Sequence, residues 1–88
     1  MNIKLNFHSD PSHGWLELPK TIARGLGKAF CDSISFFSYQ DRDNLYLEED
    51  SDASKALAAL RENGFVVSFN EIDHKNEAPC RSFKRVNC

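Results

Sequence analysis

Five short segments with the pattern or composition of β-strands are the feature that most limits how this chain can fold. In the first segment, Ile3, Leu5 and Phe7 alternate with polar residues, which is typical of a strand with one buried face. Further strands are predicted over residues 15–18, 33–39, 45–48 and 65–69. A chain of 88 residues has room for one domain, so we expect these strands to share one sheet.

Two helices are predicted between the strands. After Pro19, apolar residues recur at helical spacing, and Gly27 marks the expected end of a short helix. The second helix follows Ser51, which can cap it, and stops at Gly64. The predicted order is therefore β-β-α-β-β-α-β. We expect an α+β protein with a mostly antiparallel sheet and both helices on one face.

The sheet face without helices is a possible interface. Four aromatic residues are candidates for that face: Trp15, Phe37, Tyr39 and Tyr46. They either form an exposed interface or lie under the second helix or the tail. We expect residues 1–73 to form the domain and residues 74–88 to form a basic tail, which either extends or packs back on the domain.

Charge and cysteine content exclude several classes of protein. The chain carries 13 acidic and 11 basic residues, a formal net charge of −2, which argues against a general nucleic-acid coat or a polybasic membrane binder. Three cysteines without a CxxC pair are not typical of a disulfide framework. The start lacks the apolar core of a signal peptide, and no apolar run approaches the ~20 residues of a membrane span. We therefore expect a cytoplasmic protein with no membrane partner.

The turn between the first two strands holds the residues best suited to chemistry. Candidates for a binding loop are His8, Asp10, His13 and Trp15. A metal-dependent enzyme built on His8, Asp10 and His13 is one hypothesis, but zinc sites usually need three or four ligands and no cysteine pair is near. The simpler interpretation is a turn in which Asp10 bonds its own backbone. We therefore expect no enzyme, no metal and no cofactor.

Charged residues gather in two further places. The segment 41–52 holds six carboxylates and one base, which indicates either a solvated turn with helix capping or an acidic docking patch. Six basic residues divide between the first helix and the tail: Lys20, Arg24, Lys28, Arg81, Lys84 and Arg85. Brought together, they would form a patch able to contact phosphates, so nucleic acid is an alternative partner.

Three strings of residues carry a resemblance to a known group of proteins. Residues 7–19 read Phe-His-Ser-Asp-Pro-Ser-His-Gly-Trp-Leu-Glu-Leu-Pro, residues 34–40 read Ile-Ser-Phe-Phe-Ser-Tyr-Gln, and residues 46–50 read Tyr-Leu-Glu-Glu-Asp. Over most of residues 5–64 the chain resembles a family of short bacterial, phage and plasmid proteins without an established activity. The resemblance implies a small accessory protein of mobile DNA, and such proteins often bind and inhibit a host component.

A second resemblance covers residues 14–48. A strand ending in Pro19, followed by a short helix ending in Leu26-Gly27, is similar to the AbrB-like swapped-hairpin DNA-binding domains. The link after Gly27 lacks that family's usual turn, and Trp15 stands where a smaller residue is common. This resemblance implies an obligate homodimer in which Lys20 and Arg24 contact phosphates.

The leading hypothesis is a non-enzymatic binding module that acts on a protein partner through residues 8–15. The alternatives are a DNA-binding regulator that uses Lys20, Arg24 and the basic tail, and a small metal-dependent enzyme.

Overall fold

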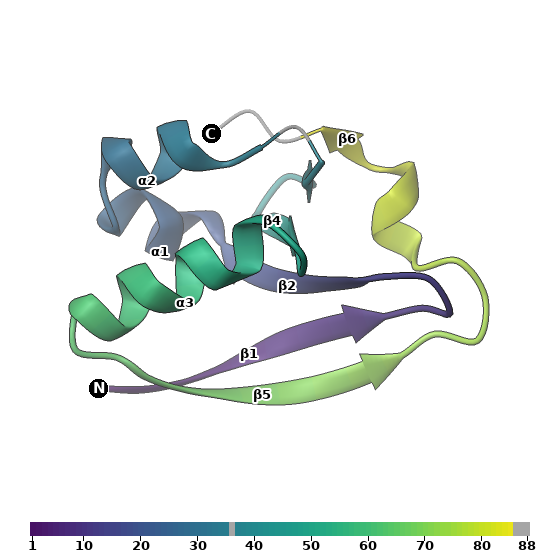
Figure 1. Cartoon of the computed structure of the whole chain (residues 1–88), viewed down its shortest axis with the longest axis horizontal. Helices are drawn as coiled ribbons and strands as arrows, with labels where there is room; N and C mark the ends of the chain where they lie inside the picture. The colour runs from purple at the N-terminus through teal and green to yellow at the C-terminus, as the bar shows by residue number, and fades with distance from the viewer. Residues whose placement is uncertain (36, 86–88) are drawn as a thin grey trace.

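The chain forms a six-stranded sheet with three α-helices in a computed structural model that describes residues 1–35 and 37–85 (Figure 1). The α+β class is thus confirmed. The strands are β1 (Asn2–Ser9), β2 (Gly14–Pro19), β3 (Tyr39–Gln40), β4 (Asn44–Glu48), β5 (Val66–Asp73) and β6 (Lys84–Arg85). The helices are α1 (Lys20–Gly25), α2 (Lys28–Ser33) and α3 (Asp52–Glu62), with a short 3₁₀ turn, η1 (Pro79–Ser82).

The sheet is mixed, which corrects the expected order of elements and part of the expected pairing. Its strand order is β5-β1-β2-β4-β3-β6. β1 pairs antiparallel with β2 but parallel with β5 along its whole length, from Asn2 opposite Val66 to Ser9 opposite Asp73. The reason is α3, which carries the chain from the end of β4 back to the start of β5. A strand that follows such a crossover runs in the same direction as the strand before it.

The first predicted helix is two helices, α1 and α2, with Gly27 between them. The φ of Gly27 is 101°, in the left-handed region where glycine is favoured, so one continuous helix cannot pass through this residue. The predicted end near Gly27 therefore describes α1 alone, and α2 follows directly.

The strand predicted over residues 33–39 is wrong except at its end. Ser33 ends α2, and only Tyr39 of that segment belongs to β3. The intervening polar groups bind a buried carboxylate instead of a neighbouring strand: Ser35 donates from its N–H and its hydroxyl to Asp52, and the hydroxyl of Ser38 donates to the same group. Residue 36 of this prediction lies outside the described residues.

One face of the sheet holds the main core. Leucines of β2 and β4 are fully buried there, namely Leu16, Leu18, Leu45 and Leu47. Helix residues from all three helices cover them, among them Ala23, Phe30, Ala56 and Leu60. The strands present these leucines at every second position, as the alternation predicts.

The segment after β5 covers the opposite face. Trp15 and Tyr46, from β2 and β4, pack there against Ala78 and Cys80 near η1, and Phe83 lies against the same cluster. Beyond it, β6 pairs with β3 at the sheet edge. Trp15 is 2% exposed, so the tail covers a ring that the sequence left as a candidate for an open interface. The described part of the chain contains no helix long and apolar enough to cross a membrane.

Candidate functional site

Asp10 organises the turn between β1 and β2. Its Oδ1 accepts hydrogen bonds from the backbone N–H groups of Ser12 and His13, both at 2.9 Å. The backbone N–H of Asp10 in turn donates to the carbonyl of His13 at 2.9 Å. This is the self-bonded turn predicted for Asp10, and it fixes the position from which His13 projects.

The same carboxylate ties the tail to the sheet. Arg81 Nε donates to Asp10 Oδ2 at 2.7 Å, and the N–H of Ala78 donates to that oxygen at 3.0 Å. The Arg81 guanidinium holds the pKa of Asp10 far below its usual range, even though burial acts in the opposite direction. The side chain of Asp10 is 1% exposed. All these donors occupy both of its oxygens, so Asp10 is a structural residue and is not available as a ligand.

Two arginines of the tail lie over aromatic rings of the sheet. The guanidinium carbon of Arg81 is 5.0 Å from the centre of the Trp15 ring, and that of Arg85 is 4.4 Å from the centre of the Tyr39 ring. Arg85 also donates to the carbonyl of Phe37 at 3.2 Å. Both distances are typical of a cation–π contact.

These arginines form one wall of a surface pocket of about 470 Å³. The pocket combines aromatic rings with charged groups of both signs, and its lining residues are His13, Trp15, Phe37, Tyr39, Glu48, Asp50, Ser51, Arg81 and Arg85. Phe37 is 54% exposed at this pocket. We refer to this hollow as the tail pocket.

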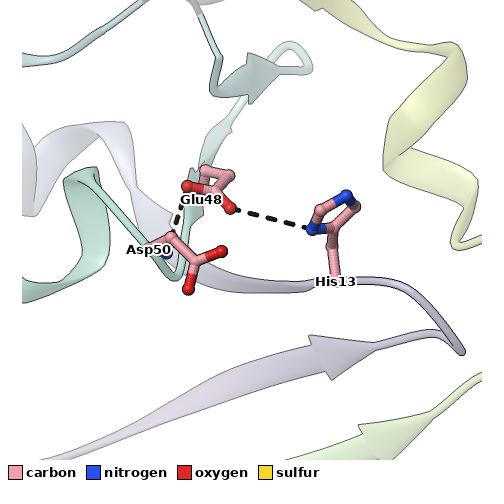
Figure 2. A group of neighbouring side chains, drawn as sticks. All are labelled: His13, Glu48 and Asp50. Atoms are coloured by element: carbon pink, nitrogen blue, oxygen red, sulfur yellow. Dashed lines mark hydrogen bonds and ion pairs between the residues drawn. The ribbon is translucent and has the colours of Figure 1, made fainter.

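A histidine and two carboxylates of the pocket lining lie close together (Figure 2). His13 Nδ1 is 4.0 Å from Glu48 Oε1, and one ligand atom from each of His13, Glu48 and Asp50 lies within 4.8 Å of the others. The pairing of β2 with β4 places Trp15 opposite Glu48 and so brings the turn of His13 beside the end of β4. The other oxygen of Glu48 accepts the N–H of Asp50 at 3.0 Å and the hydroxyl of Ser51 at 3.1 Å.

His8 belongs to a separate polar group on the same face of the sheet. Its Nε2 lies 2.8 Å from Glu17 Oε1, and its Nδ1 lies 3.1 Å from His74 Nε2. The two imidazole rings are stacked, with centroids 5.4 Å apart. Neither His8 nor Asp10 joins His13 in the three-residue cluster, so the structure does not assemble the metal site considered from sequence.

The six basic candidates do not form one patch. Arg81 and Arg85 line the tail pocket, while Lys20 and Lys84 line another hollow together with Arg42. Lys28 is paired with Asp32 at 2.8 Å, and Arg24 is exposed on α1. Residues 86–88 of the predicted basic tail lie outside the described residues.

Sequence reasoning missed Glu48, Asp50 and Tyr39 as neighbours of His13 and Trp15. Glu48 and Asp50 belong to the segment interpreted as a solvated turn with helix capping, and Glu48 does accept bonds from the turn before α3. A prediction that the strand over residues 15–18 pairs with the strand over residues 45–48 could have identified Glu48 and Asp50 as neighbours. That pairing places the end of the acidic segment beside the histidine turn.

No protein-family model, curated protein or solved structure matches this chain.

Proposed function

We propose that the chain is a small non-enzymatic binding module and that the tail pocket is where it contacts a protein partner. The observation that carries this proposal is the exposed ring of Phe37 at the rim of a hollow that also offers carboxylates and a guanidinium. Exposed aromatic and arginine side chains are enriched where proteins bind one another.

The chemistry of the pocket defines the kind of contact. An apolar or aromatic side chain of the partner would pack on Phe37 and Tyr39, with Asp50 and Arg85 setting its orientation through charge. Trp15 and Asp10, two of the binding candidates from sequence, take no direct part in this proposal because they are 2% exposed and 1% exposed, respectively. Trp15 is part of the pocket lining, and Asp10 holds Arg81, another lining residue, in place.

Phe37→Ala is the variant that tests the proposal, because it removes the exposed ring on which the proposal rests. Val66→Ala is the matched control, because Val66 is 65% exposed on β5 and does not line the tail pocket. The two variants and the unchanged chain, each carrying the same affinity tag, are incubated with lysate of the native host. Retained material is eluted in steps of rising salt and identified by mass spectrometry.

We expect a single protein that the unchanged chain and Val66→Ala retain in equal amounts through high salt, and that Phe37→Ala retains at roughly tenfold lower yield. A roughly tenfold weaker complex corresponds to about 1.4 kcal/mol, a modest loss for an aromatic contact at an interface. Equal retention by Phe37→Ala would show that the contact lies elsewhere.

A nucleic-acid-binding regulator is the second candidate. It is supported by the hollow of about 510 Å³ that Lys20, Arg42 and Lys84 line together. Recovery of DNA that is lost at moderate salt in the same experiment would favour this candidate, because phosphate contacts weaken steeply as salt rises.

A further inference from the structure

We propose that His13, Glu48 and Asp50 form a binding site for a divalent transition-metal ion such as Zn²⁺, at the rim of the tail pocket (Figure 2). The proposal does not depend on the protein partner proposed above. It also differs from the metal site considered in the sequence, because it replaces His8 and Asp10 with two carboxylates from the end of β4 and the turn that follows it.

The ligand atoms lie slightly farther apart than a bound ion would hold them. The 4.0 Å between His13 Nδ1 and Glu48 Oε1 is too long for a hydrogen bond. It is also somewhat longer than the separation of about 3.3–3.6 Å expected for two ligands of one tetrahedral ion with bonds of about 2.0–2.2 Å. The Asp50 carboxylate completes a set whose ligand atoms all lie within 4.8 Å of one another. Small side-chain rotations of two exposed residues, His13 and Asp50, would bring the set to coordination distance.

Two of the three residues are held in place by hydrogen bonds. The bonds from the Asp50 N–H and the Ser51 hydroxyl occupy Glu48 Oε2, which leaves Oε1 directed at His13. His13 is fixed at its backbone by Asp10. Hydrogen bonds that orient the ligands are a regular feature of protein metal sites.

The two carboxylates have little compensating charge. Within residues 1–35 and 37–85, His13 is the only basic side chain with a nitrogen as close as 4.0 Å to either carboxylate. Arg81 is committed to Asp10, and Arg85 stacks on Tyr39. Two neighbouring carboxylates without a cation repel each other, and a dication between them would offset that repulsion.

Trp15, in the lining of the same pocket, carries an unsatisfied donor. It is 2% exposed, and its indole N–H has no hydrogen-bond partner among the described residues. The rings of Trp15 and His13 are 6.1 Å apart. A buried N–H that lacks an acceptor needs an explanation. An oxygen ligand carried by the metal would supply the acceptor once a shift of the ring opened this nitrogen, which is closed to solvent, to the pocket.

The ligand set indicates the class of metal. One imidazole nitrogen with two carboxylate oxygens suits Zn²⁺, Fe²⁺ or Mn²⁺ better than Mg²⁺, which prefers oxygen ligands alone. Three protein ligands leave at least one coordination position. All three residues line the tail pocket, so a molecule bound in the pocket could reach the metal. Water, or a carboxylate of a bound molecule, would fill it.

The test is calorimetric titration of the tag-free full chain with ZnCl₂, with MgCl₂ as a parallel titrant. Asp50→Asn removes a ligand, and Glu49→Gln is its matched control: it removes the same charge from the neighbouring exposed position, outside the cluster. His13→Ala removes the nitrogen ligand, and His74→Gln tests the other histidine pair. Circular dichroism verifies that each variant is folded.

We expect one Zn²⁺ per chain and no detectable heat from Mg²⁺ binding. Asp50→Asn and His13→Ala should each weaken Zn²⁺ binding by roughly tenfold or more, the lower range for disturbing a metal site, while Glu49→Gln stays within about twofold. Co²⁺ titration, read by visible absorption, should give a spectrum that His13→Ala abolishes.

Three results would overturn the proposal. These are no stoichiometric Zn²⁺ binding by the unchanged chain, an equal effect of Asp50→Asn and Glu49→Gln, and loss of binding in His74→Gln but not in His13→Ala. The second would show a diffuse effect of charge, and the third would place the metal at the histidine pair of β1 and the segment after β5.

Discussion

The two faces of the sheet are built from the same strands but covered in different ways. On one face, leucines of β2 and β4 lie under three helices, and the contacts are apolar. On the other face, Trp15 and Tyr46 lie under a short segment near η1. One buried carboxylate, Asp10, binds that segment through Arg81 and Ala78.

The difference shows how an 88-residue chain can cover both faces of β2 and β4 in one sheet. A small domain has little apolar surface to bury. In this chain, most of the buried apolar surface lies between the helices and one face of the sheet. The tail contributes few apolar side chains, so a charge pair and two cation–π contacts hold it in place. We call the face under the three helices the helix face and the face under the segment near η1 the tail face. Substitutions on the helix face should therefore lower the free energy of unfolding mainly through lost volume, and those on the tail face mainly through lost charge.

The largest effect is expected from Leu47→Ala on the helix face. Leu47 is fully buried, and truncating such a leucine costs about 2–5 kcal/mol of the free energy of unfolding. Urea denaturation followed by both circular dichroism and Trp15 fluorescence measures the loss. The two signals should shift together, because the whole sheet depends on this core.

Val66→Ala is the control for Leu47→Ala, since Val66 is 65% exposed and its truncation should change stability by about 0.5 kcal/mol or less. Similar losses for the two variants would contradict the assignment of the main core to the helix face.

The second-largest loss of stability is expected from Asp10→Asn on the tail face. The change leaves Arg81 without its counter-charge in a largely buried setting, which costs about 3 kcal/mol. The response should be local: Trp15 fluorescence shifts to longer wavelength, and alkylation of Cys80 accelerates, at urea concentrations where the helices remain intact. Burial raises the pKa of the Cys80 thiol to about 12 in the intact protein, so peptide mapping should find Cys80 protected there.

Two comparisons test whether charge is the cause. Asp32→Asn breaks the exposed pair with Lys28 and should cost about 0.5 kcal/mol or less.

Because the pKa of Asp10 is lowered in the folded state, its contribution to stability is complete above the unfolded pKa of about 3.9 and is lost as the pH falls toward the folded value. Stability of the unchanged chain should therefore decline below about pH 4 more steeply than that of Asp10→Asn. Equal slopes would remove the ion pair as the explanation.

The same contrast explains how much of the fold the sequence predicts. The helix face was predictable because apolar residues repeat every second position in a strand and every third or fourth in a helix, and each pattern is local. The direction of β5 was not, because it depends on the crossover through α3 and on a pairing with β1 more than 60 residues away.

The failed strand over residues 33–39 has a different cause. Its aromatic and β-branched residues are typical of a strand, but the hydrogen bonds of Ser35 and Ser38 are made with Asp52, which is fully buried. A buried carboxylate needs donors, and satisfying it outweighs a local preference for strand. No pattern within seven residues contains that information.

The candidate site was predictable only in pieces. His13, Trp15, Arg81 and Arg85 were each singled out, as members of two unrelated groups, a binding loop and a basic patch. The tail had to fold over the sheet before these groups could share one pocket, and the pairing of β2 with β4 had to place Glu48 beside the histidine turn.

Apart from the control variants, the smallest effect on stability is expected from Trp15→Phe. The change removes packing area from the tail face but also removes a buried N–H that has no partner among the described residues. A buried unsatisfied donor costs about 1–3 kcal/mol, similar to the packing lost, so the free energy of unfolding should change by about 1 kcal/mol or less. Circular dichroism is the measurement, since this variant lacks the only tryptophan.

Tyr46→Phe is the reference, because it removes a hydroxyl that donates to Asp41 at 2.7 Å and should cost about 1–2 kcal/mol. A larger loss for Trp15→Phe than for Tyr46→Phe would contradict the expectation that removing the unsatisfied N–H offsets the lost packing.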